Sequence, residues 1–285
     1  MCNRCGTKEG RRYGLKKTVV ITGANGYLGR TLVRELISSR EYNIHILSED
    51  ITNYYEVREA MKGSPIDVFI HAAALVPSRK PTPEDLLRVN YLATRNIACH
   101  VYLDTHFIFL SSDLVFPSEP GRIWRTDDEP FPSQSVYSMT KAITEDYLIN
   151  KTHMEKLSIL RTSMLYGGDQ DLGRDNFFRF VESSLKAREN IEVYTNLYSH
   201  PTHVEDLSRF IISIIDSERT GIIHACSDEY YNRLELAEKI CERVQGDKKL
   251  LIPATAPKDC ETRLLPDKDF VHQCKFRLGG KGVRE

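Results

Sequence analysis

One stretch near the N-terminus constrains the fold of this chain more than any other. The β-branched residues 18–21 lead into a turn with three evenly spaced glycines, Gly23, Gly26 and Gly29, and an amphipathic helical pattern follows. Strand, glycine-rich turn and helix in this order are typical of a dinucleotide-binding βαβ unit. We expect Gly23 to allow the tight turn, Gly26 to let the backbone approach a pyrophosphate, and Gly29 to let the helix pack closely on the sheet.

The same turn predicts where the cofactor phosphates bind. The first N–H groups of a helix have no intrahelical partner, and the helix dipole favours an anion beside them. A second strand over residues 42–47 closes a unit of the expected length. The predicted cofactor contacts in this unit are Gly23, Asn25, Gly26, Tyr27, Leu28 and Gly29.

The end of the second strand carries the acidic residue expected to contact the adenosine ribose. Glu49 lies 20 residues after Gly29, where a carboxylate can accept hydrogen bonds from the ribose hydroxyls. An acid there repels a 2′-phosphate, which favours NAD over NADP, although a solvated acidic turn explains the residue nearly as well. Asp50 and Ile51 complete this predicted cofactor edge.

Bulk composition excludes several classes of protein. The 285 residues are 41% hydrophobic and carry a formal net charge of −1, which argues against nucleic acid as a partner. No apolar run reaches the length of a membrane span. The seven cysteines are scattered and odd in number, so we expect reduced thiols and a cytoplasmic protein. Cys2 and Cys5 have metal-like spacing but no second pair, and we predict a flexible tail over residues 1–16 and no metal site.

Three further buried strands are predicted, over residues 67–71, 106–110 and 157–161, with helical patterns between them. This alternation predicts an α/β fold, a Rossmann-type doubly wound parallel sheet. Ligands of such sheets bind beyond the carboxyl ends of the strands, where this chain places small or polar residues. They are Ala72, Ala73 and Ala74 after one strand and Ser111, Ser112 and Asp113 after the next. Asn90, on a helix predicted over residues 82–99, is either structural or part of a proton relay.

A tyrosine and a lysine four residues apart on a helix form the strongest catalytic candidate. Tyr137 and Lys141 face the same side of that helix. The spacing occurs twice more, at Tyr13/Lys17 and Tyr147/Lys151, but only this copy follows a strand that ends in Ser112. We expect the Lys141 ammonium, together with the positive nicotinamide of a bound oxidised cofactor, to lower the pKa of Tyr137, whose ordinary value is near ~10, and so help it to exchange a proton.

Taken together, these motifs resemble the extended short-chain dehydrogenase/reductases over about residues 17–225. The segments 109–116, 50–53 and 201–202 look most like those of dTDP-4-dehydrorhamnose reductases. The resemblance implies NAD(P)H as cofactor, a nucleotide-sugar substrate and a catalytic set of Ser112, Tyr137 and Lys141. In this set Tyr137 donates the proton, Lys141 binds the nicotinamide ribose, and Ser112 donates to the carbonyl oxygen. The substrate contacts that it implies are Ser111, Asp113, Met164, Asn176 and Phe177.

Several alternatives to the reductase remain open from the sequence. A non-catalytic NAD(P)-binding subunit is one, because the regulatory β subunit of methionine adenosyltransferase has a similar Ser-Ser-Asp stretch. A nucleotide-sugar epimerase, which reuses the same catalytic set, is another.

The sequence predicts two domains. A dinucleotide-binding domain covers residues 17–164, with 203–225 returning to it, and a smaller substrate-binding lobe covers 165–202 and 226–285. The helix from Tyr137 is a candidate homodimer contact.

Overall fold

The computed structural model describes residues 16–63, 65–131, 135–167, 176–274 and 277–278. The predicted tail with Cys2 and Cys5 lies outside the described residues. No helix in these ranges combines the length and the apolar character needed to cross a membrane.

A six-stranded parallel sheet in the order β11-β6-β4-β3-β1-β2 forms the centre of the molecule. Its strands are β1 (Lys17–Thr22), β2 (Tyr42–Ile46), β3 (Val68–His71), β4 (His106–Ser112), β6 (Leu157–Thr162) and β11 (Gly221–His224). Because β2 lies on one side of β1 whereas β3, β4, β6 and β11 follow on the other, the sheet is doubly wound. The predicted Rossmann-type α/β fold is confirmed.

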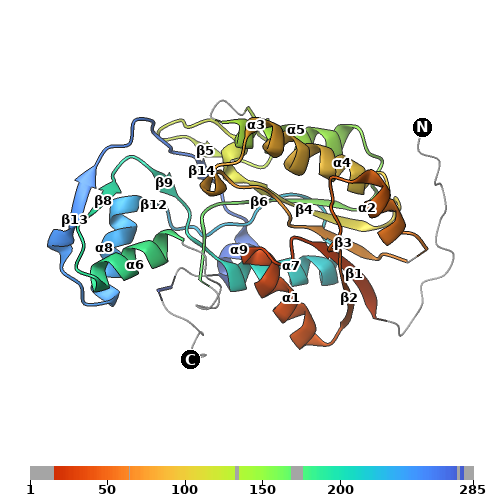
Figure 1. The fold of residues 1–285 in the computed structure, drawn as a ribbon, viewed down its shortest axis with the longest axis horizontal. Coiled ribbons are helices and arrows are strands. Elements are labelled where there is room, and N and C mark those ends of the chain that lie inside the picture. The colour runs from red at the N-terminus through yellow and green to blue at the C-terminus, as the bar shows by residue number, and fades with distance from the viewer. Residues whose placement is uncertain (1–15, 64, 132–134, 168–175, 275–276, 279–285) are drawn as a thin grey trace.

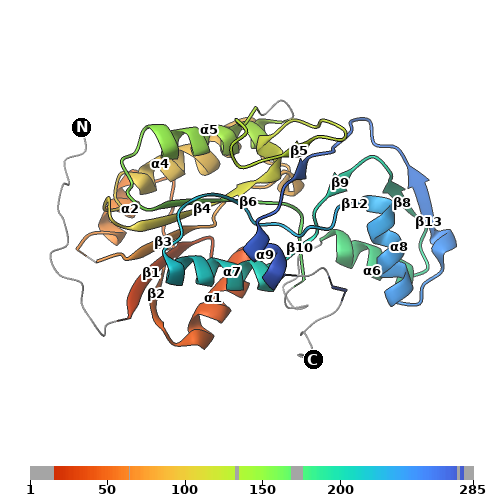
Figure 2. The same ribbon diagram turned by 180° about the vertical axis from the view of Figure 1, so that it is seen from behind.

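Helices cover both faces of the sheet (Figures 1 and 2). One face carries α1 (Tyr27–Ser39), α7 (Val204–Ser217) and α9 (Lys268–Gln273), and the other carries α2 (Tyr54–Ala60), α4 (Ala93–Ala98) and α5 (Val136–Asn150). Successive strand residues point to opposite faces, so Val19 and Ile21 pack under α1 and α7, whereas Val20 packs in the other layer. Burial on both faces explains the continuous apolar runs of the strands.

The helix predicted over residues 82–99 contains a π-helical turn. It starts as α3 (Pro83–Leu86), with Thr82 as its N-cap, and changes to π geometry over Leu87–Leu92 before continuing as α4. Apolar periodicity shows where a helix runs but not a widened turn within it. Such turns occur often at functional sites, and Asn90 lies within this one.

A smaller lobe lies at one end of the sheet (Figure 1). It is built from α6 (Phe177–Lys186), α8 (Arg233–Arg243), β8 (Ile191–Tyr194) and β13 (Leu251–Ala254), and it has a hydrophobic core of its own. Short strand pairs connect the segments around it: β7 (Leu165–Tyr166) with β10 (Thr202–His203), β9 (Tyr198–Ser199) with β12 (Tyr231–Asn232), and β5 (Ile123–Trp124) with β14 (Arg263–Leu264). Isolated 3₁₀ turns cover Pro77–Arg79, Asp113–Val115 and Lys248–Leu250.

Part of the C-terminal region packs against the sheet domain. Within residues 226–285, which the sequence predicts for the smaller lobe, β14 pairs with β5 and α9 packs against α7. The physical reason is burial of apolar side chains, because Leu264, Phe270 and Cys274 are each at most 3% exposed there.

Candidate active site

The glycine turn has the close packing that a phosphate-binding loop needs. Gly23 has a φ of +71°, and a Cβ built on it would lie 2.6 Å from the Ala73 nitrogen. A Cβ on Gly29 would lie 2.0 Å from the carbonyl oxygen of Gly23. Gly29 therefore lets helix α1 pack against the backbone of the glycine turn. The sequence predicts instead that Gly29 packs the helix on the sheet. Gly26, the N-cap of α1, has no side chain to occupy the first N–H groups of the helix.

The three alanines after β3 lie beside this loop. Ala73 donates its N–H to the Thr22 hydroxyl at 3.3 Å, and the Gly23 backbone packs against Ala72 and Ala73. The turn residues thus fit a dinucleotide phosphate, and the carboxyl ends of β1 and β3 both face it.

Asn90 holds the loop after β3 in place. Its Oδ1 accepts the Leu75 N–H at 2.8 Å, and its Nδ2 donates to the Leu75 carbonyl at 3.1 Å and to the Thr140 hydroxyl at 3.3 Å. This amide connects the end of β3 to helix α5 and has no hydrogen bond to the Tyr137 or Lys141 side chain. Of the two alternatives left open by the sequence, the contacts favour the structural one.

Ser112 and Asp113 form a buried polar pair at the carboxyl end of β4. The Ser112 hydroxyl donates to Asp113 Oδ1 at 2.9 Å, and the Ser163 hydroxyl donates to Asp113 Oδ2 at 2.5 Å. Asp113 is only 8% exposed, and this burial raises the pKa of its carboxyl. Ser163, which follows β6, was not among the predicted site residues.

Tyr137 lies in the first turn of α5, within range of both Ser112 and Asp113. Burial raises the pKa of Tyr137 to about 12, with a further increase from the Asp113 carboxylate and an opposing hydrogen bond with Ser112. The protein's own groups therefore raise this pKa and do not by themselves produce the expected decrease. The phenol is protonated at neutral pH.

The contacts of Lys141 explain why the protein's own groups do not lower this pKa. Its ammonium donates to the Leu110 carbonyl at 2.7 Å and lies 4.7 Å from the centre of the Phe109 ring, which places it against β4. Burial lowers the pKa of Lys141 to about 8, while the Glu145 carboxylate raises it. Ser112, Tyr137 and Lys141 nevertheless all lie near the carboxyl end of β4.

Ser111 points away from the other site residues. Its hydroxyl donates to Glu145, which also binds Arg161 in a fully buried ion pair at 2.8 Å. Neighbouring residues on a strand face opposite sides of the sheet, so Ser111 and Ser112 cannot both face the same ligand. The geometry gives no support to the predicted substrate contact of Ser111, and strand alternation was the signal that could have excluded it.

The predicted ribose edge is only partly organised for binding. Glu49 and Asp50 are exposed, and the Asp50 carboxylate accepts hydrogen bonds from the Thr52 hydroxyl and N–H at 2.8 and 2.9 Å. These bonds hold the pKa of Asp50 below its ordinary value. Ile51 packs against the second core layer. Asp50 thus shapes the turn, and Glu49 remains the predicted ribose contact.

The substrate-side residues gather around Arg233, which the sequence reasoning missed. Nη1 of Arg233 donates to the Met164 sulfur at 2.7 Å and to the Ser199 hydroxyl at 2.6 Å. Its guanidinium lies 5.2 Å from the centre of the Phe177 ring. Two predicted substrate residues, Met164 and Phe177, therefore contact one unexpected arginine. A single arginine at the start of a helix gives no signal in the sequence.

Asn176 connects the smaller lobe to the phosphate loop. Its Oδ1 caps helix α6, and its Nδ2 donates to the Tyr27 hydroxyl at 2.8 Å. Tyr27 in turn donates to the Gly167 carbonyl. Burial raises the pKa of Tyr27 to about 12. Tyr27 and Asn176, predicted for cofactor and substrate respectively, are thus direct partners.

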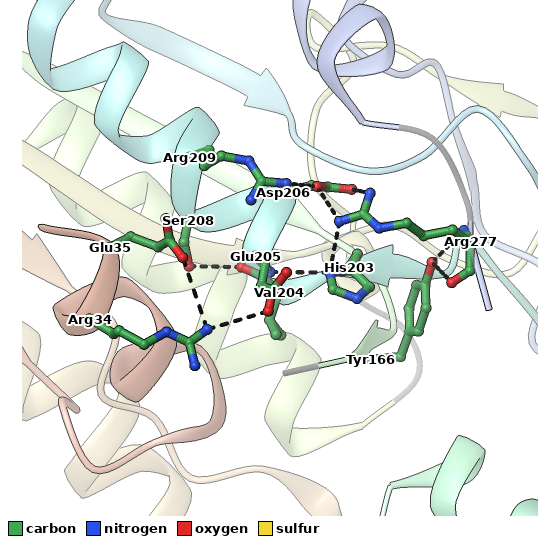
Figure 3. Close-up of polar contacts among 10 residues, drawn as sticks. All are labelled: Arg34, Glu35, Tyr166, His203, Val204, Glu205, Asp206, Ser208, Arg209 and Arg277. Carbon is green, nitrogen blue, oxygen red and sulfur yellow. Dashed lines mark hydrogen bonds and ion pairs between the residues drawn. The ribbon is translucent and has the colours of Figure 1, made fainter. Parts of the chain in front are cut away.

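A second polar cluster lies where the chain passes from the sheet domain into the smaller lobe, beside Tyr166 and His203 (Figure 3). The Tyr166 hydroxyl donates to the Arg277 carbonyl and accepts the Arg277 N–H, both at 3.1 Å. Both terminal nitrogens of Arg277 donate to the Asp206 carboxylate at 2.8 Å. The ring of His203 packs directly on Gly167, where a Cβ would lie 2.2 Å from its Nε2. The C-terminal segment therefore holds the backbone next to Gly167.

The chain is similar to a known family and to several known proteins. The family model for the RmlD substrate binding domain matches residues 17–266. The probable low-salt glycan biosynthesis reductase Agl14 of Haloferax volcanii is 29% identical over 81% of each chain. A dTDP-4-dehydrorhamnose reductase of Mycolicibacterium smegmatis is 26% identical over 84% of this chain and 73% of its own.

Solved structures show the same architecture. The crystal structure of dTDP-4-dehydrorhamnose reductase from Bacillus anthracis in complex with NADP superposes with a TM-score of 0.78 at 25% identity, over 89% of this chain and 92% of that one. A dTDP-glucose 4,6-dehydratase from the same organism, in complex with NAD, shares the fold at 16% identity with a TM-score of 0.76. The chain thus belongs to the RmlD family of extended short-chain dehydrogenase/reductases, as its motifs had indicated.

Proposed function

We propose that this chain is an NAD(P)H-dependent reductase acting on the keto group of a nucleotide-linked 4-keto-6-deoxy sugar. One observation carries the proposal: the hydroxyls of Ser112 and Tyr137 and the ammonium of Lys141 lie at the carboxyl end of β4. The glycine turn of β1, two strands away, fits the cofactor phosphates. The names of the relatives, which include dTDP-4-dehydrorhamnose reductases, support this substrate class.

The residues of the chain would divide the reaction among them. Bound NAD(P)H would supply the hydride. Tyr137, protonated at neutral pH because its pKa is about 12, would donate its phenolic proton to the developing alkoxide. Ser112 would redirect its hydrogen bond from Asp113 Oδ1 to the substrate oxygen, and Lys141 would bind the nicotinamide ribose.

The test is consumption of NADPH or NADH in the presence of dTDP- and GDP-linked 4-keto-6-deoxy sugars. The substitution Tyr137→Phe removes the proton donor, and we expect at least a ~100-fold loss of rate. Tyr147→Phe is the matched control, because it alters another tyrosine of the same helix with the same spacing to a lysine. The control should keep the wild-type rate.

Two outcomes would replace this proposal. If the protein binds NADPH but reduces no sugar of the panel and co-purifies with a stoichiometric enzyme partner, the regulatory-subunit alternative is correct. If purified protein retains NAD and interconverts sugar epimers without consuming cofactor, the chain is an epimerase.

A further inference from the structure

Arg233 is a partly buried cation whose direct hydrogen-bond and ring contacts are all with neutral groups. Its polar contacts are the Met164 sulfur and the Ser199 hydroxyl, both through Nη1, and its flat face lies over the Phe177 ring. Within the described part of the chain it forms no ion pair. Burial lowers the pKa of Arg233, while the Asp113 carboxylate, which forms no ion pair with it, partly opposes this change.

The other donors of this guanidinium are available to a ligand. Nε and Nη2 have no hydrogen-bond partner among the described residues, yet neither belongs to the buried, unpartnered atoms. They are therefore accessible. A guanidinium held by one nitrogen and stacked on a ring presents its remaining N–H groups in a fixed fork, which matches the oxygens of a phosphate.

Arg233 is connected to the candidate catalytic residues by a short chain of contacts. It binds Met164, the residue after Ser163, and Ser163 donates to the Asp113 carboxylate that also accepts from Ser112. Arg233 and Asp113 also attract each other electrostatically. An anion bound by Arg233 would therefore belong to a molecule that also reaches Ser112 and Tyr137.

We infer that Arg233 binds the diphosphate of the sugar-nucleotide substrate and anchors it with the sugar directed toward Ser112. This inference rests on the proposed function, because a nucleotide-linked sugar is the substrate class that carries such a group. Helix α8 does not provide the anion site by its own N–H groups, since Asn232 and Glu235 already cap its first turn. The side chain of Arg233 is the recognition element.

The experiment measures binding and requires no turnover. Isothermal titration calorimetry would compare dTDP, UDP, GDP and CDP with their nucleosides, using the full chain in the presence of NADPH. Arg233→Gln should weaken binding of the preferred diphosphate about 10- to 100-fold and leave the nucleoside unchanged. Arg233→Lys keeps the positive charge but lacks the forked N–H groups, so its diphosphate affinity should lie between those of the wild-type protein and Arg233→Gln. Arg243→Gln, an exposed residue in the last turn of the same helix, is the matched control.

The outcomes separate this inference from the proposed reductase. Unchanged diphosphate binding in Arg233→Gln overturns it even if the enzyme reduces a sugar, and so does an equal loss for diphosphate and nucleoside, which would indicate a structural role. Failure of wild-type protein to bind any of the four diphosphates also overturns it. Selective loss of diphosphate binding supports it, whether or not a keto sugar has been found that the protein reduces.

Discussion

Tyr27, in the first turn of the helix after the phosphate loop, donates a hydrogen bond to the carbonyl oxygen of Gly167. The two residues are 140 positions apart in the chain. One belongs to the predicted cofactor site and the other to the segment that leads into the smaller lobe. This contact couples the position of the phosphate loop to the position of the lobe.

Tyr27→Phe should weaken that coupling. The Gly167 carbonyl and the Asn176 amide both lose the hydroxyl, so we expect a loss of about 1–2 kcal/mol in the free energy of unfolding and an increase in the KM for NADPH. Urea denaturation and steady-state kinetics measure the two effects. Tyr55→Phe, at a side chain that is 71% exposed, is the control. An unchanged KM alongside lowered stability would show that the contact is only structural.

Gly29→Ala should reverse the usual effect of this substitution. Alanine normally stabilises a helix by up to ~1 kcal/mol relative to glycine. Here its Cβ would lie 2.0 Å from the Gly23 carbonyl oxygen, so we expect a loss of about 1–3 kcal/mol and at least tenfold weaker NADPH binding. Wild-type NADPH affinity in the Gly29 variant would contradict the assignment of this loop.

Arg277→Gln should loosen the C-terminal segment. The Asp206 carboxylate, only 2% exposed, would lose two charge-assisted hydrogen bonds and keep Arg209 as its remaining partner. We expect a loss of about 1.5–3 kcal/mol in the free energy of unfolding by urea denaturation. Arg88→Gln, which breaks an exposed ion pair with Asp85, should cost at most ~1 kcal/mol. Equal effects of the two substitutions would mean that the Arg277 contact contributes no more than a surface pair.

Lys141→Met should stabilise the protein at neutral pH while it removes activity. Because burial lowers the pKa of Lys141 to about 8 from an ordinary 10.5, the unfolded chain binds more protons between these values. Wild-type stability therefore contains a penalty below pH 8 that is relieved as pH rises toward 10.5. The variant lacks this penalty, so we expect it to be more stable by roughly 2–3 kcal/mol at pH ~7.

Urea denaturation of the wild-type protein and of Lys141→Met at pH ~7 and pH ~9.5 tests this prediction. The quantity compared is the difference between their free energies of unfolding at each pH. The advantage of the variant should shrink at the higher pH. Two parallel pH profiles would show that Lys141 is not desolvated in the folded state.

Local sequence determined much of this molecule. The glycine spacing fixed the β1-to-α1 turn, because only a residue without a Cβ fits at Gly23 and Gly29. Continuous apolar runs identified the buried strands, and polar residues at their ends identified the site edge, since parallel strands end at the same edge of a sheet. Tyr137 and Lys141 could be assigned together because residues four apart share a helix face.

Only the tertiary structure decided which groups face one another and how burial changes the pKa values of the charged ones. The protein's own groups raise the pKa of Tyr137, because burial and Asp113 act on it while Lys141 binds the Leu110 carbonyl. Arg233 joins Met164 and Phe177 across separate segments, and α9 packs on the sheet domain. Desolvation and long-range contacts depend on how the whole chain packs, and no local pattern of residues encodes them.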